Sequence, residues 1–162
     1  AASAKVILRP TLIYGLGRDK NIAEITRFIK KFGFFPLFGK ALGLRQPVHA
    51  EDVANACISA LESPSALNRS YNISGGETIT YRKMVSRIFD ALGKRPYFIP
   101  IPLPLFRLAV TCLRLLPRYG HWSTSMAERM NQDLVFDHTA ATEEFCYTAR
   151  KFFPARKDLG EF

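Results

Sequence analysis

The residues best suited to binding chemistry are cationic and concentrated in one part of the chain. Two acidic residues and nine basic ones lie between residues 82 and 129, the latter being Arg82, Lys83, Arg87, Lys94, Arg95, Arg107, Arg114, Arg118 and Arg129. The whole chain carries a formal net charge of +9. Such a surface attracts a phosphate-bearing small molecule, an anionic membrane or a nucleic acid. Because no block of five like charges occurs, we expect a globular domain with a basic face and no nucleic-acid partner.

The sequence offers no set of residues for metal binding or nucleophilic catalysis. Cys57, Cys112 and Cys146 are widely spaced and form no CxxC pair, which argues against a zinc site and against a disulfide framework. His49 is a lone imidazole without an acid at a catalytic spacing, so we interpret it as structural. We therefore predict no catalytic residue and no metal ligand in this chain.

Short apolar segments alternate with amphipathic ones, which is the pattern of an α/β chain. Residues 5–10 (KVILRP) predict a buried strand that ends at its proline. Residues 21–33 predict a helix with one apolar face and a glycine as its stop. Residues 33–43 are expected to form a loop. A short strand at 44–49 then leads into a helix that ends near residue 62.

The second half continues the alternation. A strand is predicted at 71–74, followed by a helix with Thr80 as N-cap and Gly93 as stop. Four prolines between Pro96 and Pro104 require an extended backbone there. Further helices are predicted at 105–116, 123–131 and 139–145, an extended stretch at 134–136, and a tail at 156–162. These strands are too few for a free-standing doubly wound sheet, so we expect the first strand to have partners upstream.

Four motifs, in order, resemble landmarks of the extended short-chain dehydrogenases/reductases, specifically the NAD-dependent nucleotide-sugar epimerases and dehydratases. They are RPTLIYG with GRDKN (9–21), RQPVHAEDVA (45–54), YNISGGE (71–77) and the segment 133–147. The resemblance implies the C-terminal part of a Rossmann-type α/β fold. Its last sheet strand would occupy residues 1–15, a small mixed α/β substrate-binding region 16–155, and a tail 156–162. The chain would then be the C-terminal, substrate-binding half only.

The resemblance also implies NAD or NADP as cofactor of the whole protein. Pro10 and Thr11 would line the nicotinamide pocket through backbone contacts. We expect the main dinucleotide loop to be absent, because Gly15-Leu16-Gly17 lacks a third glycine at the required spacing. We also take the family's Tyr-x-x-x-Lys pair to be missing, since Tyr81 is followed by a lysine at the wrong position. Hydride transfer would then belong to a missing N-terminal Rossmann half.

Five residues would contact a nucleotide-diphosphate sugar if the resemblance holds. Arg45 and Asn21 would bind the diphosphate, Tyr14 would stack against or hydrogen-bond the substrate, and Arg129 with Asp133 would hold the nucleotide. Each has a structural alternative: an arginine at a strand end, an ordinary helix N-cap, a packed aromatic ring and a pair at an unmatched spacing.

The expected function is thus the substrate-binding portion of an NAD(P)-dependent nucleotide-sugar epimerase/dehydratase-like oxidoreductase. It would be cytoplasmic, inactive by itself and open to homodimerisation. One alternative is a non-catalytic relative that serves as a scaffold or assembly subunit. Another is a peripheral membrane-associated domain, because the segment 104–118 is apolar, carries arginines and is too short to span a bilayer.

Overall fold

The computed structural model describes residues 5–15, 17, 19–114 and 125–160. Along the chain the elements are β1 (Ile7–Pro10), β2 (Ile13–Tyr14), α1 (Ile22–Phe32), β3 (Phe35–Phe38), β4 (Leu44–Arg45), β5 (Val48–His49), α2 (Ala50–Glu62), the 3-10 turn η1 (Pro64–Ala66), β6 (Ser70–Ile73), β7 (Ile79–Thr80), α3 (Tyr81–Ala91), β8 (Phe98–Ile101), α4 (Leu103–Arg114), α5 (Ser125–Arg129), α6 (Thr139–Phe145) and the 3-10 turn η3 (Arg156–Leu159). The last four residues of the predicted segment 104–118 lie outside the described residues.

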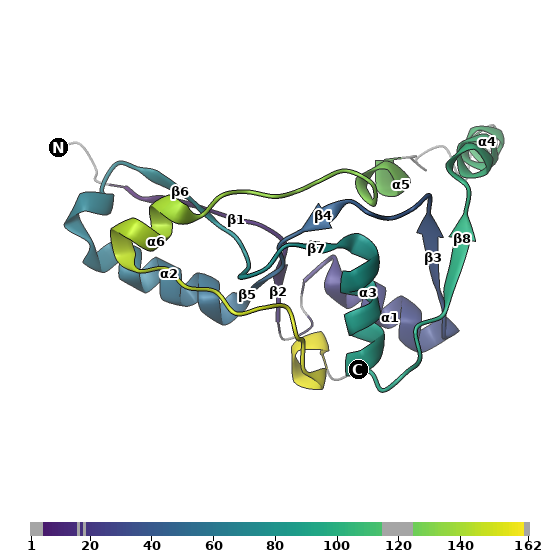
Figure 1. The fold of residues 1–162 in the computed structure, drawn as a ribbon, viewed down its shortest axis with the longest axis horizontal. Coiled ribbons are helices and arrows are strands. Elements are labelled where there is room, and N and C mark those ends of the chain that lie inside the picture. The colour runs from purple at the N-terminus through teal and green to yellow at the C-terminus, as the bar shows by residue number, and fades with distance from the viewer. Residues whose placement is uncertain (1–4, 16, 18, 115–124, 161–162) are drawn as a thin grey trace.

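The described strands pair in twos. β1 with β6, β2 with β5 and β3 with β8 are parallel pairs, whereas β4 and β7 are antiparallel. Each parallel pair is joined by a long crossover, as parallel geometry requires. Figure 1 shows an elongated molecule, with β1, β6, α2 and α6 forming one arm and α1, α3, β3, β8 and α4 lying at the other end.

Two hydrophobic clusters correspond to these two ends. The larger one packs α1 against α3 and β3, with Ile22, Ile29 and Ile88 fully buried. The smaller one lies in the arm, where alanines of α2 let the helix approach Ile73 of β6 and Phe145 of α6. The cavity described below is lined mainly by residues of the larger cluster, among them Ile25, Phe35 and Met84.

Local signals explain the helices, and the predictions based on them are confirmed. α1 ends at Gly33, whose φ of 77° is the left-handed conformation that glycine adopts without strain. The Thr80 side chain accepts a hydrogen bond from the Lys83 N–H and so caps α3.

Other expectations differ from the structure. The predicted loop 33–43 contains β3, which pairs with β8. The predicted strand 44–49 is split into β4 and β5. β1 was expected to be buried, but Ile7, Arg9 and Pro10 are exposed. These differences share a cause, because strand pairing and burial depend on partners distant in the sequence.

Part of the segment predicted to be a tail, 156–162, also differs from the prediction. Residues 156–159 form η3, in which Leu159 is fully buried. The Gly17 N–H donates to the Asp158 carbonyl, and a Cβ added at Gly17 would lie 2.4 Å from the Gly160 Cα. The C-terminal segment therefore packs tightly against the loop before α1. Of the helices within the described ranges, none has the length and apolar character needed to cross a bilayer.

Candidate functional site

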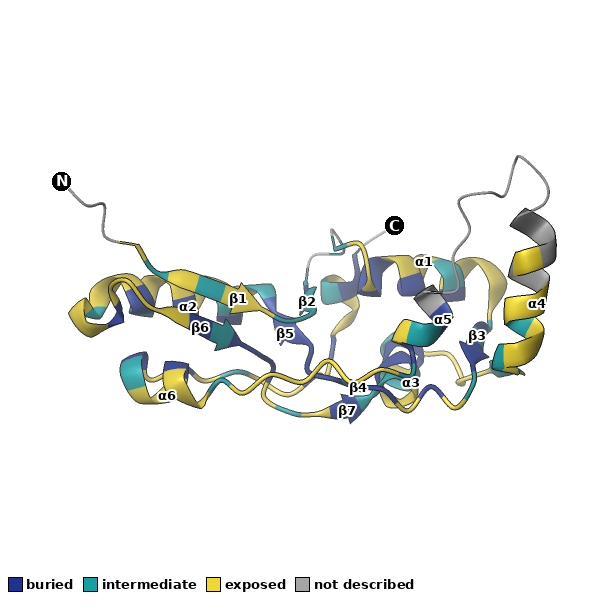
Figure 2. Ribbon diagram, turned by 90° about the horizontal axis from the view of Figure 1, so that it is seen from above, coloured by how far each residue is buried: buried dark blue, intermediate teal, exposed yellow. Residues whose placement is uncertain are grey.

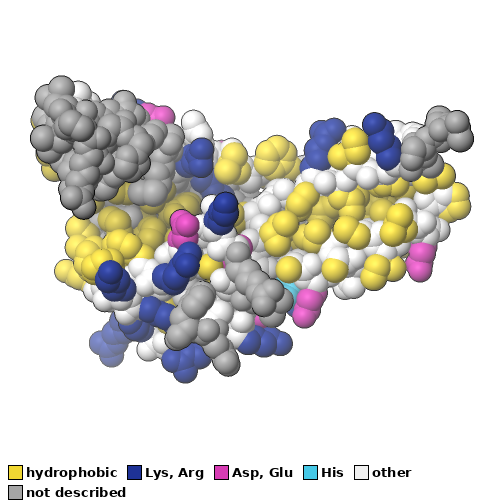
Figure 3. Space-filling view, turned by 180° about the vertical axis from the view of Figure 1, so that it is seen from behind, with side chains coloured by type: hydrophobic (Ala, Val, Ile, Leu, Met, Phe, Trp, Pro, Cys, Tyr) yellow, Lys and Arg dark blue, Asp and Glu magenta, His cyan; other side chains and the backbone are white. Residues whose placement is uncertain are grey.

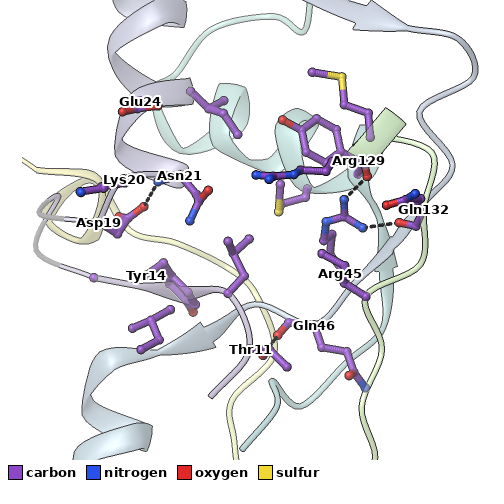
Figure 4. A pocket seen from close by; sticks show the side chains of 18 of the residues that line it. Thr11, Tyr14, Asp19, Lys20, Asn21, Glu24, Arg45, Gln46, Arg129 and Gln132 are labelled. Atoms are coloured by element: carbon purple, nitrogen blue, oxygen red, sulfur yellow. Dashed lines mark hydrogen bonds between the residues drawn. The ribbon is translucent and has the colours of Figure 1, made fainter. Parts of the chain in front are cut away.

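A cavity of about 1290 Å³ lies among β2, α1, β4, α3 and α5. Five of the seven residues predicted from the sequence line it: Thr11, Tyr14, Asn21, Arg45 and Arg129. Figure 4 shows Asp19, Lys20, Asn21 and Glu24 on one side of it and Arg45, Arg129 and Gln132 on the other. The walls between these polar groups are apolar and include Ile25, Phe28 and Met84. An apolar cavity with polar groups at two ends is suited to binding a small organic molecule.

The other two predicted residues are not among those that line the cavity. Pro10 is exposed at the end of β1. Asp133 accepts a hydrogen bond from the Leu44 N–H at 2.8 Å, which ties its loop to β4. The structure thus does not bring Asp133 together with Arg129 at the cavity.

Arg45 is almost fully buried, and its guanidinium serves the fold. It donates to the carbonyls of Leu44 at 2.7 Å and Gln132 at 2.6 Å, and also to the carbonyl of Arg129. Burial lowers the pKa of the Arg45 guanidinium. Because a guanidinium has five N–H donors and three are used here, two remain for a ligand. Arg45 therefore has the structural role that was the alternative to ligand binding, and two of its N–H groups are not used by that role.

The N-terminus of α1 is capped by a residue that sequence reasoning did not single out. The Asp19 Oδ1 accepts hydrogen bonds from the backbone N–H groups of Asn21 at 3.0 Å, Ile22 at 2.5 Å and Ala23 at 3.1 Å. The Asn21 side chain makes no capping hydrogen bond. The preference of aspartate for helix caps was the available signal, since Asp19 stands within the first motif just before the predicted helix.

Tyr14 is packed between two rings, close to edge-on. Its ring centroid lies 5.0 Å from that of His49 and 4.8 Å from that of Phe152. Burial, with a smaller effect of the Asp158 carboxylate, raises the pKa of Tyr14 to about 12. The phenol is therefore neutral near pH 7, where it can donate a hydrogen bond but cannot act as a base.

The expected absence of a Tyr-x-x-x-Lys spacing needs correction, because Tyr147 and Lys151 have it. Their backbone is not helical, so the two side chains do not share a helix face. The Tyr147 hydroxyl donates to the Ser74 carbonyl at 3.0 Å, and burial raises its pKa further above the usual value. The Tyr147 side chain therefore stabilises the packing of the arm, and its raised pKa makes it unsuited to act as a general base.

His49, next in the chain to the cavity-lining Ala50, has a structural role. The His49 Nδ1 accepts a hydrogen bond from the Glu51 N–H and caps α2, while its Nε2 lies 3.5 Å from the Asp158 carboxylate. Within the ranges that the structure describes, no group of three or more His, Cys, Asp or Glu side chains could hold a metal ion.

The first part of the chain is similar to a known protein family. Residues 2–74 match the model of the NAD dependent epimerase/dehydratase family. A mitochondrial NADH dehydrogenase [ubiquinone] 1 alpha subcomplex subunit 9 from Arabidopsis thaliana is 30% identical over 61% of this chain and 25% of its own length. A UDP-glucose 4-epimerase from Vibrio cholerae is 27% identical over 64% of this chain and 31% of its own length. The chain thus spans less than a third of either relative.

Solved structures show the same fold. A UDP-glucose 4-epimerase from Thermotoga maritima has a TM-score of 0.62 at 20% identity, over 96% of this chain and 43% of that one. A UDP-glucuronic acid 4-epimerase from Bacillus cereus, in complex with UDP-glucuronic acid and NAD, has a TM-score of 0.63 at 17% identity, over 95% of this chain and 42% of that one. At these identities the likeness concerns the fold alone.

The family match corrects the predicted identity and fold class. We expected only the substrate-binding half, with the Rossmann-type part limited to one strand in residues 1–15. The match instead runs from residue 2 to residue 74 and covers the parallel pairs β1–β6 and β2–β5. The Rossmann-like part of the family is therefore represented in this chain through β6. The chain has an α/β, Rossmann-like fold, and its residues 2–74 are similar to the NAD-dependent epimerase/dehydratase family.

Proposed function

We propose that the cavity binds a nucleotide-diphosphate sugar and that the whole protein is an NAD-dependent epimerase/dehydratase-like oxidoreductase. The observation that carries the proposal is the convergence of Thr11, Tyr14, Asn21, Arg45 and Arg129 on one cavity. These residues come from segments far apart in the sequence, yet they are the ones that the family resemblance assigned to ligand binding. UDP sugars are named for two of the structurally similar proteins.

The two ends of the cavity differ in the groups that they offer a ligand. Arg129 and the two unused N–H groups of Arg45 provide charge-assisted donors for phosphate oxygens. The neutral phenol of Tyr14 and the amide of Asn21 suit a sugar hydroxyl or carbonyl oxygen. In this arrangement the chain binds and orients the substrate, which is a contribution to catalysis through positioning.

The N-terminus of α1 does not fit the pyrophosphate of NAD. Dinucleotide sites place backbone N–H groups at a helix N-terminus against the phosphates. Here the three N–H groups after Asp19 are already bound by its carboxylate. We therefore assign no residue of this helix end to the cofactor and derive no step through it.

Calorimetric titration of the full-length protein with UDP-glucose and UDP-glucuronic acid tests the proposal. Arg129→Ala should weaken binding about 10- to 100-fold, because hydrogen bonds to a charged group contribute about 1.5–3 kcal/mol. Arg107→Ala is the matched control, since Arg107 pairs with Glu128 and is not among the residues lining the cavity. Failure of both sugars to bind, or equal affinity of Arg129→Ala and wild type, would contradict the proposal.

A second candidate is a non-catalytic assembly subunit. It is favoured by the likeness to the Arabidopsis protein, whose name describes a subunit of an NADH dehydrogenase. The two candidates differ in turnover: an epimerase or dehydratase converts a bound UDP sugar, which NMR of the reaction mixture detects. A full-length protein that produces no new sugar and migrates within a larger complex on native gels would favour the assembly role.

A further inference from the structure

We infer that a groove on the exposed face of α3 binds the phosphate group of a phosphate monoester through Arg82, Lys83 and Ser86. The groove has a volume of about 580 Å³ and is lined by Thr80, Arg82, Lys83, Ser86, Pro96 and Phe98. None of these residues lines the larger cavity. The inference is therefore independent of the proposed function.

α3 presents different faces to the groove and to the larger cavity. Ser86 follows Lys83 by three positions and Arg82 by four, so it lies next to both of them on the helix surface. Tyr81 and Met84, which line the larger cavity, belong to the other side of the helix. A ligand in the groove thus contacts a side of α3 that the larger cavity does not use.

The two cations of the groove have no carboxylate partner. Other basic side chains nearby are bound by the protein, since Arg87 pairs with Glu77 and Lys94 donates to backbone carbonyls of α1. Arg82 and Lys83 are exposed, and no carboxylate among the described residues forms an ion pair with either. No acidic residue is among those lining the groove. Two adjacent cations without a compensating carboxylate attract an anion.

The Arg82 guanidinium is held in place by an aromatic ring. Its central carbon lies 5.1 Å from the centroid of Phe98, over the ring. Phe98 in turn packs edge-on against the fully buried Phe89, with 5.7 Å between the ring centroids. A guanidinium stacked in this way keeps the N–H groups at its edge available, and their forked arrangement matches two oxygens of a phosphate.

Side chains, and not the N-terminus of α3, must bind the anion. The N–H groups of Tyr81 and Arg82 donate to carbonyls of the loop between β3 and β4, and the Lys83 N–H donates to the Thr80 hydroxyl oxygen. Because Thr80 accepts in that bond, its O–H is left to donate. The Ser86 hydroxyl has no hydrogen-bond partner in the described part of the chain. The groove therefore offers two hydroxyl donors beside its two cations.

A phosphate monoester matches this set of donors. It carries a charge of about −1.5 to −2 at pH 7 and three strong acceptor oxygens, which suit two cations and two hydroxyls. A carboxylate has one charge and two oxygens, so it would leave part of the set unused. Pro96 and Phe98 add an apolar wall against which the organic part of the ester can lie.

Saturation-transfer NMR of the full-length protein with glycerol 3-phosphate tests the inference, with glycerol as the ligand that lacks the phosphate. Glycerol 3-phosphate should bind and glycerol should not. The double variant Arg82→Gln with Lys83→Gln should weaken binding about tenfold or more, because it removes both charged donors. Ser86→Asp keeps the two cations but places a carboxylate between them, and should weaken binding similarly.

The matched control is Lys40→Gln with Arg95→Gln, which removes the same charge from exposed positions outside the groove and the larger cavity. It should bind glycerol 3-phosphate as the wild type does, and thermal unfolding of each variant verifies the fold. If the wild type does not bind, or if the groove variants bind like the wild type, the inference is refuted. Loss of binding in Arg129→Ala alone would place the phosphate in the larger cavity and refute it too.

Vesicle flotation distinguishes two sources of the phosphate group. Phosphatidic acid carries a phosphate monoester, so vesicles of phosphatidylcholine with and without it are compared. Recruitment that requires phosphatidic acid and is lost in the Arg82→Gln, Lys83→Gln variant would identify a lipid headgroup as the ligand. Binding of glycerol 3-phosphate without recruitment to vesicles would identify a soluble phosphate ester.

Discussion

At the scale of single residues, the polar side chains of the cavity serve the backbone before they serve a ligand. Arg45 binds three carbonyls, and Asp19 binds three N–H groups. Gln46 donates to the Thr78 hydroxyl and accepts from the Phe136 N–H. Side chains held in this way have fixed positions, so their remaining donors and acceptors are oriented before a ligand binds.

Arg45→Ala should destabilise the protein by about 2–4 kcal/mol, because buried carbonyls of Gln132 and Arg129 lose a charged donor. Arg45→Lys keeps the positive charge but lacks the forked geometry of the guanidinium. Its free energy of unfolding should therefore lie between those of the wild type and Arg45→Ala. Urea denaturation monitored by fluorescence measures the loss. Equal stability of Arg45→Ala and wild type would show that these contacts contribute nothing to the fold.

Tyr14 should make stability depend on pH in alkaline solution. The unfolded tyrosine ionises near its ordinary pKa of 10.0, whereas the folded one has a pKa of about 12. The folded state holds this proton more tightly, so the stabilisation is complete below pH 10 and is lost as pH rises toward 12. Urea midpoints measured from pH 8 to 11.5 should fall less steeply in Tyr14→Phe. The exposed Tyr97 supplies the control, since Tyr97→Phe should retain the wild-type slope.

At the scale of elements, the C-terminal segment is held by side chains of distant helices and turns. The Asp52 carboxylate of α2 accepts from the Arg150 backbone N–H at 3.0 Å and from its Nε at 2.9 Å. Glu77 accepts from the Phe152 N–H at 2.7 Å. Further along the same segment, the Asp158 carbonyl accepts a hydrogen bond from the Gly17 N–H, so the C-terminal segment also packs against the loop before α1.

Asp52→Ala should release this segment at a cost of about 1–3 kcal/mol, because the buried carboxylate binds both a backbone and a guanidinium donor. Hydrogen exchange at the Arg150 and Phe152 amides should accelerate, and trypsin should cleave faster after Lys151. Glu51→Ala is the control, since Glu51 is exposed and its ion pair with Arg150 contributes at most about 1 kcal/mol. Similar exchange in both variants would contradict the assigned role of Asp52.

The elements that the sequence predicts well are those with local causes. α1 and α3 follow from apolar residues at helical spacing and from caps at Gly33 and Thr80. β3 was predicted as a loop because its one proline and two phenylalanines become a strand only through pairing with β8. The predicted tail folds because Leu159 is buried and the Asp158 carbonyl accepts a hydrogen bond from the Gly17 N–H, far away in the sequence.

In the candidate site, too, the sequence predicts some features and misses those that depend on residues distant in the chain. Motif resemblance located residues that converge on the cavity, but it could not tell that the Arg45 guanidinium would be largely used by backbone carbonyls. It also gave no role to Asp19, whose carboxylate caps α1 beside the cavity. Pro10 and Asp133 were placed by position in a motif, and the turns of the backbone direct them elsewhere.

At the scale of the whole molecule, the arm formed by β1, β6, α2 and α6 exposes apolar surface. Figure 3 shows hydrophobic side chains along this arm. Ile58 and Leu61 of α2 are 56% and 80% exposed, and Ile7 of β1 is 44% exposed. β1 pairs with β6 along one edge in the described part of the chain. An exposed strand edge beside apolar side chains is a surface that favours association.

This 162-residue chain should therefore self-associate through the arm as its concentration rises. The double variant Ile58→Lys with Leu61→Lys should remain monomeric at concentrations where the wild type does not, because two charges on α2 oppose its burial against another molecule. Sedimentation velocity over a concentration series measures the difference. Tyr97→Lys changes an equally exposed apolar residue at the opposite end and should leave association unchanged. If the Tyr97 variant instead abolished association while the double variant did not, the contact would lie at that end, and the exposed arm would not be the surface responsible.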